Sequence, residues 1–212
     1  MNREKKAYNE MRLHILLDNG HGDNTPGKHS QLWSDGSQLF EYEFNRDIVR
    51  RIANRLSAKC ISFDIITPEL NDIPLYQRVN RVNHICNVNG AKNCLLISVH
   101  SNASANHNAS GWEVWTSPGK TLSDDYAEIF YKRAQAAFPS WKMRCDTTDG
   151  DHDKESRFTI LQKSLCPALL TENFFMDFEM DCRFIMSEEG RSQIAQMHFD
   201  AILDCIDFYE QL

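Results

Sequence analysis

Three short, mostly apolar runs along the chain stop abruptly at polar or ionisable residues. They cover residues 13–17, 95–99 and 168–171. Such runs are typical of strands buried on both faces in a parallel sheet that is covered by helices. The runs lead into His21, His100 and Glu172, respectively. Because open α/β sheets place their ligand sites beyond the carboxyl ends of the strands, we expect these three side chains at one edge of the sheet.

The segments between these runs change to a helical period. From Glu41 onwards, apolar residues recur on one helix face, at Phe44, Ile48, Val49, Ile52 and Leu56. Further helices are expected over about 74–89, 123–138 and 187–209, and further strands over about 61–67, 111–116 and 158–162. Alternating strands and helices predict an α/β fold with a mostly parallel, twisted central sheet of about six strands, covered by helices on both faces.

The chain of 212 residues is long enough for a full hydrophobic core. We expect residues 12–212 to form a single domain and residues 1–11 to be a polar lead-in. Two segments, 22–40 and 139–156, have no clear period, and loops of this length are usually functional. The second contains His152 between two aspartates, which could touch a substrate, although a solvated loop is the plainer interpretation.

Composition narrows the class of protein. The net charge of -7, with no basic stripe, argues against a nucleic-acid partner. No window is apolar enough for membrane insertion. The seven cysteines are scattered without a C-x-x-C pair, which favours reduced thiols over a disulfide scaffold or a cysteine zinc site. The charged start of the chain lacks the apolar stretch of a signal peptide, so we expect the protein to be cytoplasmic as synthesised.

The strand ends carry the candidate chemistry. His21 and His100 need a third ligand to hold zinc, and Glu41 at the start of the first helix should return to the same sheet edge. A His/Glu/His set with one open position is a recognised catalytic zinc arrangement. Glu172 then remains as a general acid or base. Each residue alone also has a plainer interpretation, as a hydrogen-bonded turn residue, a helix cap or an ion-pair partner.

Four segments together resemble the zinc-dependent N-acetylmuramoyl-L-alanine amidases of the amidase-3 family, over about residues 13–212. The matching segments are Asp18-Asn19-Gly20-His21-Gly22, Glu41-Tyr42-Glu43-Phe44-Asn45, Ile97-Ser98-Val99-His100-Ser101-Asn102-Ala103 and Pro167-Ala168-Leu169-Leu170-Thr171-Glu172. In this family the glutamate ligand lies four residues before an asparagine, and that register selects Glu41 over Glu43.

The resemblance implies one zinc ion per chain, bound by His21, Glu41 and His100, with Glu172 catalytic and residues 12–212 as the catalytic domain. It implies hydrolysis of the amide between the lactyl group of N-acetylmuramic acid and the L-alanine of the peptidoglycan stem peptide, as a lysin-like enzyme that acts on the cell wall after release. Arg78 matches an arginine common in the family, and we expect Arg78, Asn102 and Asp23 to contact the substrate.

The chain departs from the family pattern at the mouth of the expected site. Asp23 replaces the usual second glycine after the first histidine, Thr25 an acidic residue before Pro-Gly, and Lys28 a small residue. Regulated relatives carry a long insert after the strand that corresponds to residues 111–116, and this insert blocks the zinc. Here the connection is short, so we expect no activator protein and regard segment 139–156 as the remaining candidate lid.

Two other functions remain possible at this stage. A zinc peptidase acting on stem peptides would begin its site with H-x-x-E, whereas the residue three after His21 is Asn24. A non-catalytic wall-binding domain could keep the fold, but binding alone would not require Glu172. Peptidoglycan is the expected partner in all three cases.

Overall fold

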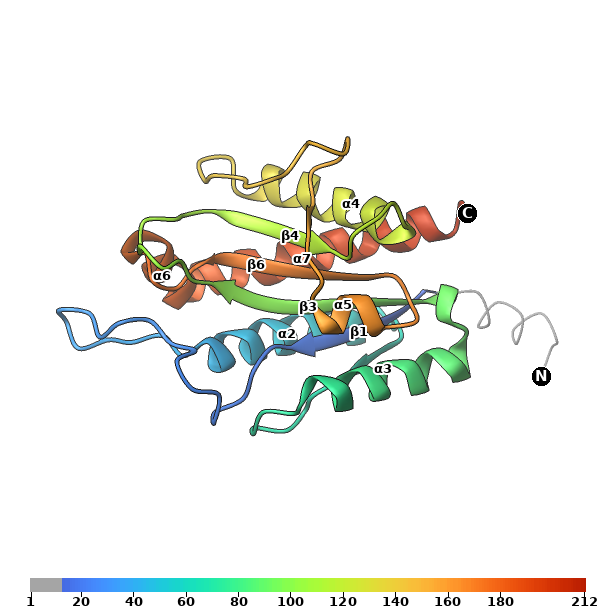
Figure 1. The fold of residues 1–212 in the computed structure, drawn as a ribbon, viewed down its shortest axis with the longest axis horizontal. Coiled ribbons are helices and arrows are strands. Elements are labelled where there is room, and N and C mark those ends of the chain that lie inside the picture. The colour runs from blue at the N-terminus through green and yellow to red at the C-terminus, as the bar shows by residue number, and fades with distance from the viewer. Residues whose placement is uncertain (1–12) are drawn as a thin grey trace.

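The computed structural model describes residues 13–212, so the predicted lead-in over 1–11 lies outside the described residues. A six-stranded sheet crosses the molecule (Figure 1). Its strands are β1 (His14–Asn19), β2 (Phe63–Ile65), β3 (Cys94–Asn102), β4 (Trp112–Thr116), β5 (Lys154–Glu155) and β6 (Ala168–Phe175). The order is β2-β1-β3-β6-β4-β5, and only the pairing of β4 with β6 is antiparallel. The predicted mostly parallel sheet is confirmed.

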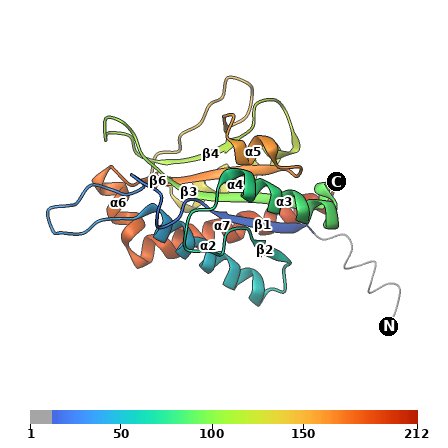
Figure 2. The ribbon, with the colours of Figure 1, turned by 60° about the horizontal axis from the view of Figure 1, so that its bottom comes forward.

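Helices cover both faces of this sheet (Figures 1 and 2). They are α2 (Glu41–Ala58), α3 (Leu75–Asn89), α4 (Leu122–Ala137), α5 (Thr159–Lys163), α6 (Glu179–Met186) and α7 (Glu188–Tyr209), with a 3-10 turn η1 (Ala91–Asn93). The larger core contains residues of α2, α4, α6 and α7, and the smaller core contains residues of α3 and α5. No helix of residues 13–212 has the length and apolar character needed to cross a membrane.

The central strands are apolar on both sides because each side faces a different core. In β3, Leu95, Ile97 and Val99 pack in the larger core, while Leu96 packs in the smaller one. The continuous apolar run therefore reflects a strand covered twice, as the sequence predicts. Since β1, β3 and β6 are mutually parallel, their carboxyl ends meet at one edge of the sheet.

Two elements differ from the prediction. The prediction of a strand over 158–162 is wrong, because these residues lead into and form α5. The sixth strand of the sheet is β5 instead. The buried side chains there are the neighbours Ile160 and Leu161, with Phe158 and Gln162 exposed, which suits a short helix and not the alternation of a strand. Helix α6 was not expected, although the spacing of its buried Cys182 and Ile185 is helical.

The core also holds a histidine. His198 of α7 is fully buried, and its ring nitrogens lie 3.0 Å from Thr171 Oγ1 and 2.9 Å from the carbonyl oxygen of Ile194. The imidazole satisfies both contacts when neutral, donating to the carbonyl and accepting from the hydroxyl. Burial lowers the pKa of His198 to about 4 and outweighs the opposing hydrogen bond to Ile194.

This histidine is expected to make the fold sensitive to acid. The unfolded chain takes up the proton near pH 6.5, whereas the native protein resists it until about pH 4, so the free energy of unfolding falls between these values as pH decreases. The loss is on the order of 3 kcal/mol. We expect His198→Gln to flatten this slope in urea unfolding between pH 7.5 and 4.5. Equal slopes for the two proteins would contradict the assignment, because other titrating groups act equally in both.

Candidate metal centre

His21, Glu41 and His100 come together at the carboxyl edge of the sheet. One ligand atom from each lies within 4.8 Å of the others. The Nδ1 atom of His100 is 3.0 Å from Glu41 Oε1, and the Nε2 atom of His21 is 3.5 Å from Glu41 Oε2. Thus one carboxylate lies between two imidazoles whose ring centroids are 4.9 Å apart. The three residues come from the loop after β1, the first turn of α2 and strand β3.

The loop after β1 is held in place by backbone contacts. Asn45, one turn after Glu41, donates from Nδ2 to the carbonyl oxygen of Gly20 at 3.0 Å, and Arg46 donates to that of His21 at 2.9 Å. A Cβ atom on Gly20 would overlap the ring of His100, so only glycine allows this approach. His21 itself has a φ of 64°, in the left-handed region. The chain thus turns sharply to present its imidazole.

Glu41 is the buried member of the group, with 1% exposure. Its Oε1 atom accepts from the backbone N–H of Ser101 at 3.3 Å, whereas Oε2 is buried without a hydrogen-bond partner. This oxygen lies 3.5 Å from His21 Nε2 and 3.9 Å from Lys28 Nζ without a hydrogen bond to either, so a bound cation would satisfy it. Two nitrogens and one carboxylate oxygen are also the donor types that catalytic zinc takes, with a further position left open. These residues therefore fit zinc.

The protonation states of the ligands suit a cation. Burial, chiefly, lowers the pKa of His21 to about 4, so its imidazole is neutral at pH 7. For Glu41, burial opposes ionisation, but the hydrogen bond and charge of His100 and the charges of His21 and Lys28 lower the pKa to about 2. For His100, burial opposes charge, yet Glu41 outweighs it and raises the pKa. A divalent cation between Glu41 and His100 would replace that proton.

Glu172 lies on β6 directly opposite His100 on β3. Its Oε2 atom is buried without a hydrogen-bond partner. Burial raises the pKa of Glu172 to about 8, the carboxylates of Glu41 and Glu113 add to this, and His100 and Lys28 oppose it. A buried carboxyl group beside a metal centre can both accept and donate a proton.

A second buried glutamate, which the sequence reasoning missed, lies beside Glu172. Glu113 of β4 pairs across the sheet with Glu172, and its carboxylate binds the guanidinium of Arg144 and, at 3.1 Å, the ammonium of Lys154. The only signal in the sequence is a lone glutamate within the apolar strand Trp112–Thr116. Both basic partners come from segment 139–156, which therefore contacts the sheet beside Glu172.

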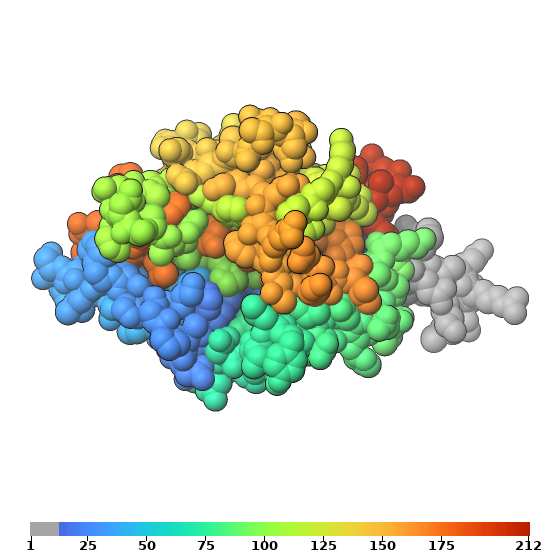
Figure 3. Space-filling view, in the orientation of Figure 1, coloured from blue at the N-terminus to red at the C-terminus, as the bar shows by residue number. Residues whose placement is uncertain are grey.

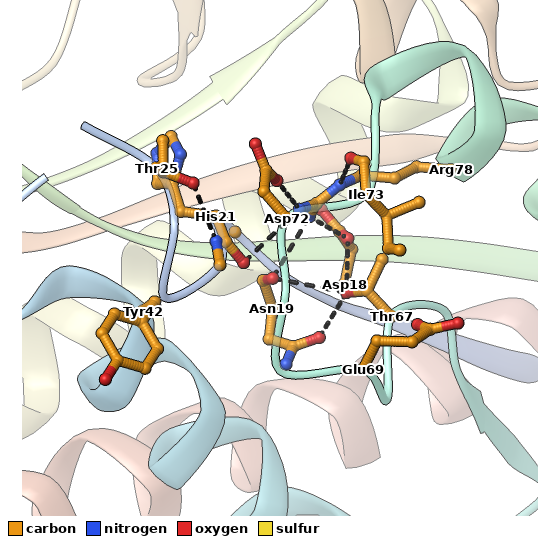
Figure 4. A network of polar contacts seen from close by, with 12 residues as sticks. Asp18, Asn19, His21, Thr25, Tyr42, Thr67, Glu69, Asp72, Ile73 and Arg78 are labelled. Atoms are coloured by element: carbon orange, nitrogen blue, oxygen red, sulfur yellow. Dashed lines mark hydrogen bonds and ion pairs between the residues drawn. The ribbon is translucent and has the colours of Figure 1, made fainter.

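Arg78 does not reach the open side of the site. It is 2% exposed, and its guanidinium binds Asp18 Oδ1 at 2.8 Å and Asp72 Oδ1 at 2.7 Å (Figure 4). It also donates to the carbonyl oxygen of Asn19 at 3.1 Å. This placement favours a role in bracing the end of β1 over the expected contact with substrate. Asp23 and Asn102 are exposed and partly exposed, respectively, in the segments that carry His21 and His100.

Comparisons with known proteins bear on this geometry. A family model described as N-acetylmuramoyl-L-alanine amidase matches residues 15–204. N-acetylmuramoyl-L-alanine amidase LytC of Bacillus subtilis (strain 168) is 26% identical over 187 residues, which are 88% of this chain and 34% of LytC. An endolysin of Bacillus phage SPP1 is 23% identical over 91% of this chain and 66% of its own length. The chain thus spans about a third of one curated relative and just under two thirds of the other.

A solved structure agrees with the sequence matches. The crystal structure of N-acetylmuramoyl-L-alanine amidase from Clostridium difficile 630 superposes with a TM-score of 0.79 at 26% identity, covering 93% of this chain and 98% of that one. The resemblance inferred from the four motifs is thereby confirmed at the level of the family. Since the family model covers nearly the whole described structure, with all three ligands and Glu172 inside it, this chain belongs to the N-acetylmuramoyl-L-alanine amidase family.

Proposed function

We propose that this protein is a zinc-dependent hydrolase of the amide bond between the lactyl group of N-acetylmuramic acid and the L-alanine of the stem peptide. One observation carries the proposal: the His21–Glu41–His100 group lies beside Glu172, which is paired with His100 across the sheet. Family membership supports the choice of this amide over other peptidoglycan bonds. The H-x-x-E opening of the rival peptidases is absent after His21.

Different residues bind the metal and transfer protons in this proposal. His21, Glu41 and His100 would hold zinc, with Asn45 and Gly20 fixing the loop that presents His21. When bound, zinc supplies positive charge that polarises the amide carbonyl and makes water more acidic. The sheet edge excludes solvent from Glu41, which strengthens each charge interaction there.

Glu172 acts as the proton carrier. Its carboxylate takes a proton from the attacking water as the new C–O bond forms at the lactyl carbonyl. It then gives this proton to the alanine nitrogen as the C–N bond breaks, which leaves a free carboxylate and a free amine. Asp23 and Asn102, which are exposed and partly exposed, are our candidates for substrate contact, and Arg78 holds the end of β1 in place.

We further propose a lytic role on the cell wall, after synthesis in the cytoplasm and release from it. The similarity to a phage endolysin supports this role. An enzyme of this kind must be active without a partner. The connection from β4 to α4 comprises only residues 117–121, too few for a blocking helix. In the other candidate lid, segment 139–156, Asp153 accepts a hydrogen bond from Thr116 Oγ1. Thr116 lies three residues along β4 from Glu113, which is paired with Glu172, so this contact is roughly 10 Å along the strand from Glu172.

An open site predicts that trimming the exposed tip of that segment changes little. Residues 146–150 are all exposed. We expect replacement of 146–150 by a two-residue Gly-Ser link to leave turnover of a soluble muropeptide within about twofold, since exposed loop tips tolerate changes in length. Steady-state rates for the two proteins provide the test. A large rise in rate would mean that the segment is an inhibitory lid.

The reaction itself is tested on purified peptidoglycan. Digestion should release free lactyl ends on muramic acid together with new N-terminal alanine, and mass spectrometry of the soluble products distinguishes these from other cuts. Glu172→Gln protein is the matched control. New amino termini other than alanine would identify a stem-peptide peptidase and refute the proposed bond. Binding to the wall without any cleavage would favour a non-catalytic module.

A further inference from the structure

Within residues 13–212, a group of carboxylates outside the proposed active site takes part in no ion pair. Asp149, Asp151, Asp153 and Glu155 alternate along the chain just before and within β5. Helix α4 brings Asp124 to the same place, in its first turn. Figures 1 and 3 show this part of segment 139–156, in yellow-orange, on the outer surface next to α4.

The central carboxylates are buried and only half satisfied. Asp153 is 2% exposed and Asp124 is 7% exposed. Asp153 Oδ2 accepts from Thr116 Oγ1 at 2.5 Å, and Asp124 Oδ2 accepts from the backbone N–H of Thr121 at 2.5 Å. The Oδ1 atoms of Asp124, Asp151 and Asp153 are all buried without a hydrogen-bond partner. Buried, unpaired carboxylate oxygens are costly, and three at one place require an explanation.

Among the described residues, no basic side chain pairs with these three carboxylates. His152 points to Glu128, with Nδ1 2.8 Å from Oε2, and Lys154 points to Glu113. Within residues 13–212, none of the ion pairs involves Asp124, Asp151 or Asp153. Burial raises the pKa of Asp153 to about 7, the hydrogen bond from Thr116 opposes this rise, and the hydrogen bond and charge of Asp151 and the charge of Asp124 add to it.

We infer that Asp124, Asp151 and Asp153 bind a calcium ion. The donors are all oxygens, with no nitrogen or sulfur ligand, which matches a hard cation and not zinc. Calcium takes six to eight oxygens in a flexible arrangement. Among the described residues only the His21 group brings three ligand atoms within 4.8 Å, so the aspartates would close around the ion by side-chain rotation. Water and the nearby Thr116 hydroxyl would complete the shell.

The ion would fasten segment 139–156 to α4 and to the end of β4. The same segment supplies Arg144 and Lys154, which hold Glu113 beside Glu172. Calcium would therefore order the border of the proposed active site without entering it. This inference does not depend on the proposed reaction, since binding and stability report on it directly.

The test uses the full, zinc-loaded chain in calcium-free buffer at pH 7.5, titrated with CaCl2 and, separately, with MgCl2. We expect calorimetry to show one calcium per chain. At about one hundred times the dissociation constant, the melting temperature should rise by roughly 5 °C or more. Asp153→Asn should abolish both signals. Asp125→Asn, an exposed neighbour of Asp124 with the same loss of charge, should retain them.

A proton shared between Asp151 and Asp153 is the competing explanation. In that case calcium produces neither heat nor a shift in melting temperature, and Asp153→Asn raises the melting temperature in every buffer because it removes repulsion. That outcome would overturn the calcium site. Should Asp153→Asn fail to fold, Asp151→Asn, at a partly exposed position, replaces it with the same expected results.

Discussion

Replacing His100 by alanine is expected to release the metal. The fold places one nitrogen of His100 3.0 Å from Glu41, so its loss leaves only His21 and Glu41 to hold the ion. Changes to residues that only orient zinc ligands cost 10- to 100-fold in affinity, so removing a ligand should cost more than about 100-fold. Metal analysis after dialysis should find zinc in the parent protein and almost none in His100→Ala. A chelator should abolish activity, and added zinc should restore it.

Matched controls are available within the chain. His84→Ala changes an exposed histidine of α3 and should keep its zinc. Glu41→Gln should lose the metal, whereas Glu43→Gln, two residues away and exposed, should keep it. Full zinc occupancy in His100→Ala, or equal losses from both glutamate variants, would show that the ligands have been misassigned.

Glu172→Gln should separate chemistry from metal binding. Glutamine keeps the volume and removes the titratable group, so the fold and the zinc content should persist. Loss of a general acid or base typically lowers turnover roughly 10²- to 10⁴-fold. Stability should not fall, because the buried carboxyl group of Glu172 lies among the like charges of Glu41 and Glu113. Turnover, zinc content and melting temperature measured on one preparation test all three statements.

An exposed glutamate provides the reference for this variant. Glu179→Gln, at the start of α6, should match the parent protein in every measurement. Near-normal hydrolysis by Glu172→Gln would move the proton-carrying role to another group. Loss of zinc in the same variant would instead make Glu172 part of the metal shell.

The strands that build the site could be predicted because burial on both faces leaves a strong mark in the sequence. In β1, β3 and β6 an apolar run ends at a polar residue, and parallel pairing brings these ends to the same edge of the sheet. Helices such as α2 were predictable from period alone. Strand β5 was not, because its two residues carry no period and are held by contacts with distant groups, such as Lys154 over the ring of Trp115.

The site was predictable only in part for a related reason. His21 follows β1, and His100 and Glu172 lie in the carboxyl-terminal halves of β3 and β6, which extend further than the apolar runs predicted. Their convergence therefore follows from topology. Glu113 depends on the direction of β4, which runs antiparallel to β6 and so places the start of β4, not its end, beside the metal edge. Strand direction at a sheet edge is set by the path of long connections, and hydrophobic patterning does not record that path. The burial of Arg78 likewise depends on Asp18 and Asp72, which are far from it in sequence.

The sheet ends on both sides in very short strands, three residues in β2 and two in β5. Long exposed edges offer unpaired backbone groups to other chains and invite aggregation, and short edges remove most of that template. Concentrated protein is therefore expected to resist intermolecular strand pairing. An apparent molar mass from light scattering that stays constant as the protein concentration increases would show this.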